Sequence, residues 1–171
     1  MYTQKMTVFR RLLASWFLCL AALSAQAQPQ NEVAARNAVS SFYRSHIKQQ
    51  KLFTARSVRL WRSSITPELY QALLYELKRQ ANYLRANPGN KPFFEGGDPF
   101  IEFSDGYPTA FSIGRIIILG GKAYTKLSLA FTNSTGKWKD YDSLALQRIN
   151  GRWLVSDRGS NLLKTLRRRK Y

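Results

Sequence analysis

The sequence predicts an α+β fold in which N-terminal helices pack on a curved four-stranded antiparallel meander, followed by a short C-terminal helix. Three observations support this prediction. Apolar residues recur at three- and four-residue spacings in the N-terminal half and at two-residue spacings from residue 109 onward. Short turns separate the expected strands, and such turns make consecutive strands antiparallel neighbours. Each expected helix has one apolar stripe, which needs the sheet to cover it.

Three helices are expected before the sheet. Asn31 is expected to cap a first helix over residues 32–47. Within residues 48–65, a short helix is expected to bury Ala55, Val58 and Trp61 and to expose three arginines. Thr66 as N-cap, with proline at the first helical position, begins the third helix, which Asn87-Pro88-Gly89 ends.

A long loop over residues 87–108 is rich in proline and glycine, which excludes a regular helix or strand. Its apolar residues predict that it packs on the core; they are Phe93, Phe94, Phe100, Ile101, Phe103 and Tyr107. A loop of this length in a small domain is typically functional or disordered.

Four strands are expected after the loop, at residues 109–119, 122–132, 138–149 and 152–156. Leu127, Leu129 and Phe131 should face the core, while Lys126, Ser128 and Thr132 should face away. Ser160 is expected to cap a last short helix, whose leucines face inward.

The first 27 residues have the layout of a cleavable signal peptide. Lys5, Arg10 and Arg11 precede the apolar run Leu12–Leu23, and Ala25-Gln26-Ala27 follows as a cleavage site. We therefore expect a periplasmic or secreted protein whose residues 28–171 form a single α+β domain. Cys19, the only cysteine, leaves with the signal peptide. No later segment is apolar enough to span a membrane.

The net charge of +17 favours an anionic partner. The alternative is that the positive charge serves only to keep a small domain soluble. Removing three positive charges with the signal peptide leaves about +14. Outside the cell, such a charge favours an acidic protein or an anionic lipid or glycan of the envelope. The candidate binding residues are Arg56, Arg59, Arg62, Arg167, Arg168, Arg169 and Lys170. Nucleic acid is disfavoured, because an exported protein rarely meets it and the aromatic residues are expected to be buried.

Several residues are candidates for a catalytic or a metal site. A small isomerase or hydrolase would need a carboxylate beside a tyrosine in an apolar cavity, and the candidates are Asp140, Asp142, Asp157, Tyr124 and Tyr141. An exposed aspartate paired with a base explains the same pattern. His46, the sole histidine, is expected in the core. We expect no cofactor and no metal, because the acidic stretch from Glu95 to Asp105 lacks EF-hand spacing.

A family resemblance adds to these expectations. The order of helices, a loop with Asp98-Pro99-Phe100, a meander, and a strand with Gly151, Trp153 and Val155 followed by Asp157 resembles the nuclear transport factor 2-like superfamily of cone-shaped α+β domains. Within it, the chain is most similar to a bacterial envelope family known as domain of unknown function 3828. The resemblance covers about residues 32–169. It implies a fold and a compartment, and a structural role for Asp98, Pro99, Phe100, Gly151, Trp153 and Asp157.

The leading hypothesis is a non-catalytic binding protein of the bacterial envelope that recognises an anionic ligand or an acidic protein. One alternative is an immunity-type protein that blocks one toxin, and a second is a small pocket enzyme. A partly exposed sheet face could also pair two copies of the chain.

Overall fold

The structure, a computed structural model, describes residues 29–48, 53–91, 94, 97–101, 107–134, 136–159 and 161–168. The chain divides into two units, Met1–Ala34 and Ala35–Tyr171, and the packing described below belongs to the second. The expected signal peptide lies outside the described residues. No helix in the described ranges is both long enough and apolar enough to cross a membrane.

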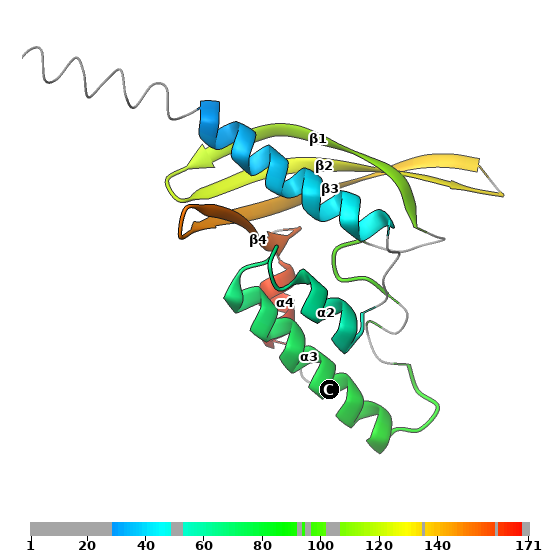
Figure 1. The fold of residues 1–171 in the computed structure, drawn as a ribbon. Coiled ribbons are helices and arrows are strands. Elements are labelled where there is room, and N and C mark those ends of the chain that lie inside the picture. Colours follow the sequence, from blue (N-terminus) through cyan, green and yellow to red (C-terminus); the bar gives the residue numbers. More distant parts are fainter. Residues whose placement is uncertain are drawn as a thin grey trace, which may run out of the picture. The chain divides into compact units, whose positions relative to one another are not determined.

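A four-stranded antiparallel meander forms the sheet, in the order β1-β2-β3-β4 (Figure 1). Its strands are β1 (Pro108–Leu119), β2 (Lys122–Asn133), β3 (Gly136–Ile149) and β4 (Arg152–Arg158). All four expected strands are therefore confirmed, although β3 begins earlier and β4 ends later than the periodicity predicts. The sheet is open rather than closed into a barrel.

The two faces of the sheet differ in burial, because successive side chains of a strand point to opposite sides. On one face, called the inner face, alternate residues of β2 are buried: Ala123, Thr125, Leu127, Leu129 and Phe131. On the opposite, outer face, Lys122, Tyr124 and Lys126 are exposed. The expected alternation along this strand is confirmed.

The first helix, residues 29–48, packs on the inner face from Ala35 onward. Its buried stripe is Ala35, Val39, Phe42, Tyr43 and His46. The Tyr43 ring lies 5.9 Å from that of Phe111 on β1. The expected cap is wrong: residue 29 is already helical, so Asn31 lies inside the helix rather than at its start.

Three further helices are α2 (Ala55–Trp61), α3 (Pro67–Ala86) and α4 (Leu162–Arg168). The Thr66 hydroxyl accepts a hydrogen bond from Leu69 N at 3.3 Å, which confirms the expected cap of α3. Thr54 caps α2 in the same way through Ser57 N, at 3.2 Å. α3 contacts both α2 and α4. The expected cap of α4, Ser160, lies outside the described residues.

The segment before α3 covers one edge of the sheet. Ile65 pairs with Val155 of β4 in parallel. Val155 N donates to Ser64 O at 2.9 Å, and Thr66 N donates to Val155 O at 2.8 Å. An uncovered edge would offer unpaired backbone groups to other chains, so this pairing protects β4.

Candidate functional site

The Asp98-Pro99-Phe100 turn is buried. One oxygen of Asp98, Oδ1, accepts a hydrogen bond from Phe100 N at 2.8 Å, which closes the turn. The other, Oδ2, contacts His46 Nε2 of the first helix. Phe100 and Ile101 are at most 1% exposed, which confirms that this part of the loop packs on the core. Phe93 and Phe103 lie outside the described residues.

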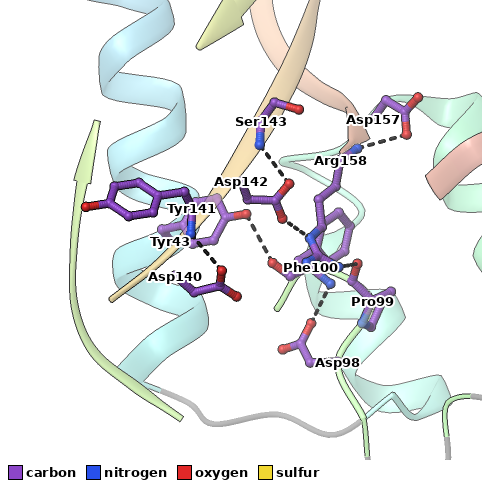
Figure 2. Close-up of polar contacts among 10 residues, drawn as sticks. All are labelled: Tyr43, Asp98, Pro99, Phe100, Asp140, Tyr141, Asp142, Ser143, Asp157 and Arg158. Carbon is purple, nitrogen blue, oxygen red and sulfur yellow. Dashed lines mark hydrogen bonds and ion pairs between the residues drawn. The ribbon is translucent and has the colours of Figure 1, made fainter. Parts of the chain in front are cut away.

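The backbone carbonyls of this turn are bound by side chains from two distant elements. Figure 2 shows Tyr43 of the first helix and Arg158 at the end of β4 converging on the turn. Tyr43 Oη donates to Phe100 O at 3.2 Å, and Arg158 Nη1 donates to Pro99 O at 3.4 Å. Satisfied carbonyls are what a buried loop requires.

Aromatic rings enclose His46. Its ring centroid lies 5.0 Å from Trp61, 5.1 Å from Phe42 and 5.6 Å from Phe100. The side chains of His46 and Asp98 have no exposed surface. A reactant in solvent therefore cannot reach either group, and the pair serves to hold the turn against the helix. The expected core position of His46 is confirmed.

Asp142 and Arg158 form a second ion pair, close to the same turn (Figure 2). Asp142 lies on the inner face of β3, and its Oδ1 accepts a hydrogen bond from Ser143 N at 2.7 Å. The pair borders a pocket of about 350 Å³ whose other walls include Pro99 and Leu162. Since Arg158 binds both Asp142 and the Pro99 carbonyl, it links the sheet to the turn.

Asp157 anchors the last helix. Its Oδ1 accepts hydrogen bonds from Arg158 N at 2.8 Å and from Leu163 N at 3.0 Å, in the first turn of α4. The residue also borders an open pocket of about 310 Å³ together with Tyr124 and Lys122. The carboxylate is thus engaged by backbone donors, as a helix cap is, rather than free in a closed apolar cavity.

Tyr124 and Tyr141, the candidate tyrosines of a catalytic pocket, point away from the core. Tyr124 is 38% exposed and Tyr141 is 72% exposed, so neither reaches inward as the pocket-enzyme alternative would require. Most of the described aromatic residues are buried or half-buried, and the expectation of buried aromatic residues fails at exposed tyrosines such as these two. The register explains this result. Tyr124 pairs with Ala145 and Tyr141 with Ser128, and all four positions lie on the outer face.

Burial affects two other tyrosines. Desolvation raises the pKa of Tyr43 far above its ordinary value, and the nearby Arg158 charge opposes that rise. Partial burial, aided by the negative charge of Asp98, raises the pKa of Tyr107 to about 12. Both hydroxyls therefore stay protonated in the folded protein across the physiological pH range.

The three arginines of α2 are exposed, as the sequence predicts. Ser57, Val58 and Trp61 form the buried side of this helix, and Arg56, Arg59 and Arg62 are exposed. The expected burial of Ala55 is wrong, because Ser57 takes the inward position and Ala55 is exposed. The guanidinium of Arg62 lies 5.7 Å from the centre of the Tyr70 ring. Arg152 joins this group, because its Nη2 donates to the carbonyl of Ser63 at 3.2 Å. No local sequence pattern indicates this fourth member, which is the first residue of β4.

The C-terminal arginines are separate from the α2 group. Arg167 pairs with Glu68 of α3, although both side chains stay at least half exposed. Arg168 is exposed. Arg169 and Lys170 lie outside the described residues. Among the described elements, α4 packs on α3 and β4 and has no extensive contact with α2, so the described basic residues do not form one cluster.

Comparisons with protein-family models, with curated proteins and with solved structures give no match for this chain. The family resemblance therefore remains a prediction.

Sequence reasoning missed a third pocket, of about 410 Å³, on the outer face of the sheet. It lies over a bulge in β1, between the pairs Ile113–Leu127 and Ile116–Thr125. The only sequence signal was Gly114, a residue without a side chain inside an otherwise continuous strand pattern.

Proposed function

We propose that this protein is an exported, non-catalytic binding protein of the bacterial envelope. It holds an anionic ligand or an acidic protein on the surface formed by Arg56, Arg59, Arg62 and Arg152, called here the arginine surface. The observation that supports this proposal is that these four arginines, unlike several carboxylates, form no ion pair in the described part of the chain. In the described part of the chain, ion pairs engage Glu68, Glu76, Asp98 and Asp142. Within those same ranges, no carboxylate pairs with the four arginines.

Arginine suits this role because its planar guanidinium can donate two parallel hydrogen bonds to one carboxylate or phosphate. The net charge, +17 for the full chain and about +14 once the three positive charges of the signal peptide are removed, adds long-range attraction for polyanions. The resulting binding should weaken steeply with salt, because exposed charges are screened within about 8–10 Å at physiological ionic strength.

The compartment and the family belong to the same proposal. Export is inferred from the charged start, apolar run and Ala25-Gln26-Ala27 site of the sequence. We assign the fold to the nuclear transport factor 2-like superfamily because helices cover one face of a four-stranded meander and the Asp98-Pro99-Phe100 turn packs beneath them. The Trp153 side chain, buried on β4, matches the strand motif that led to the resemblance.

The test compares two triple variants that lose the same charge. Arg56→Ala/Arg59→Ala/Arg62→Ala removes the α2 part of the arginine surface. Lys48→Ala/Lys78→Ala/Lys91→Ala removes three exposed lysines elsewhere. Each protein is bound to a heparin column and eluted with a salt gradient, after circular dichroism has confirmed folding. We expect the arginine variant to elute at clearly lower salt and the lysine variant to elute close to wild type. Equal shifts would show that net charge alone governs retention.

A second experiment separates the partner classes. Wild-type protein serves as bait in an envelope extract, and the bound material is eluted with rising salt and analysed for proteins and lipids. Anionic lipid or glycan eluting early supports the charge-driven binder. One protein recovered in equal amounts at high salt identifies the immunity-type alternative instead.

A further inference from the structure

The outer face of the sheet combines exposed apolar side chains with positive charge. Ile117 is 52% exposed, Leu119 is 66% exposed and Tyr141 is 72% exposed. Along β1–β3, the outer positions set by the register carry lysines and no acidic residue; these lysines are Lys122, Lys126, Lys137 and Lys139. An exposed apolar area with one sign of charge is typical of a binding surface.

The pocket of about 410 Å³ lies within this face. Its apolar lining comes from Ile117, Tyr124 and Ala145. Gly114 approaches the neighbouring strand closely: a Cβ atom at this position would lie 3.1 Å from the carbonyl oxygen of Lys126. The bulge also brings Arg115 to the pocket, on the same wall as Gly114.

The bulge is held from the opposite side of the sheet. Arg36 of the first helix donates from Nη1 to Ile113 O and from Nη2 to Gly114 O, each at 3.1 Å. A guanidinium that binds both carbonyls fixes the backbone where the register shifts. The pocket wall is therefore preorganised rather than formed only when a ligand arrives.

We propose that this pocket binds a single-chain amphipathic anion, a free fatty-acid carboxylate. The chain lies against Ile117, Tyr124 and Ala145, and the carboxylate lies between the cations of Arg115 and Lys126. Charge complementarity supports this occupant, because the described lining residues include the cations of Arg115 and Lys126 and no carboxylate. The volume is at the small end of ligand pockets, which suits one chain better than a two-chain lipid. This site is separate from the arginine surface.

The probe is sodium dodecanoate below its micelle concentration, added to the full protein and followed by isothermal titration calorimetry. We expect saturable binding of one dodecanoate per chain. Lys126→Ala should weaken it about tenfold, because a charge-assisted contact is lost. Ala145→Leu should weaken it at least as much by filling the pocket. Lys139→Ala, which removes an outer-face lysine away from the pocket, should change it less than about twofold.

One further ligand and two further variants test the roles of the charge, of the apolar wall and of the arginine surface. Methyl dodecanoate, which lacks the charge and so loses its attraction to both Arg115 and Lys126, should bind to wild type at least as weakly as dodecanoate binds to Lys126→Ala. Ile117→Asn, a change at a half-exposed position, should weaken dodecanoate binding if Ala145→Leu fails to fold. The triple change at Arg56, Arg59 and Arg62 should leave it unaltered, which separates this site from the arginine surface.

Three outcomes would overturn the proposal. Binding only to vesicles of anionic phospholipid, with no binding of monomeric dodecanoate, would make the face a membrane contact. Sedimentation showing a dimer that Ile117→Asn dissociates, again without dodecanoate binding, would assign the face to a second copy of the chain. Dodecanoate binding that is insensitive to both Lys126→Ala and Ala145→Leu would place the ligand elsewhere.

Discussion

His46 and Asp98 lie 52 residues apart in the chain, and their side chains pair in the core without any exposed surface. The carboxylate also closes the turn that contains it, through Phe100 N. A buried carboxylate needs such partners, because the interior does not replace the solvation lost from water. The contact therefore links the first helix to a turn that has little regular structure of its own.

Breaking this pair should destabilise the fold strongly. His46→Leu removes the partner of Asp98 and places an apolar side chain of similar size in the same position. Leaving one member of a buried pair uncompensated costs about 3–5 kcal/mol. We expect a loss of that order in the free energy of urea unfolding. Lys48→Ala, at an exposed position on the same helix, should change it by less than about 0.5 kcal/mol.

A double variant distinguishes pairing from simple packing. In His46→Leu/Asp98→Asn, the buried charge is gone as well, so the loss should be smaller than the sum of the two single losses. Strictly additive losses would show that the two side chains contribute independently.

Tyr43 should make stability fall in alkali. Its pKa is raised by burial, so the folded protein keeps this proton while the unfolded chain releases it near pH 10. The unfolded state then binds fewer protons, and stability decreases as pH rises above about 10, by up to about 1.4 kcal/mol per pH unit. Urea unfolding between pH 9 and 11 should show a shallower decrease in Tyr43→Phe than in wild type. Equal slopes would contradict this assignment.

Tyr107 offers a spectroscopic check of the same region. Its pKa of about 12 predicts that the phenolate absorbance appears late in an alkaline titration of the folded protein. Tyr107→Phe should remove a step near pH 12. Asp98→Asn, where it folds, should lower the pKa of Tyr107, because the Asp98 charge contributes to the rise.

The regular elements were readable from the sequence because each has a local signal. Thr66 followed by Pro67 marks the start of α3, and both residues occupy the predicted positions. Asn150-Gly151 marks the β3–β4 turn, where both residues have the left-handed backbone that this turn type requires. Such signals depend on neighbours in the chain, so one sequence is enough to detect them.

The site could not be read in the same way, because its contacts join residues far apart in the chain. Nothing near Asp98 indicates that His46 will be its partner. Along β3, polar residues occupy both faces, so the pattern did not show that Asp140 and Asp142 face inward while Tyr141 faces outward. The direction of these side chains follows from the register with β2, which only the folded sheet determines.

The β3–β4 turn should be sensitive at one glycine in particular. Gly151 has a φ of 78°, and a Cβ added there would have open space around it. Gly151→Ala therefore tests backbone strain alone and should cost about 1–2 kcal/mol of stability. Gly121→Ala, in the β1–β2 turn, also has open space but lacks a positive φ. A smaller loss at Gly121 than at Gly151, measured by urea unfolding, would confirm the strain.

Asp157 should contribute to stability through α4. Asp157→Ala removes the oxygen that accepts the hydrogen bond from Leu163 N at 3.0 Å, and the loss of such a cap costs about 1 kcal/mol. Asp157→Asn keeps a side-chain oxygen at this position and should lose less than half as much. Hydrogen exchange should show faster opening of α4 in the alanine variant, while the Tyr43 and Phe100 region stays protected. If the asparagine variant lost as much as the alanine variant, the negative charge of Asp157 rather than its acceptor oxygen would be what holds the helix.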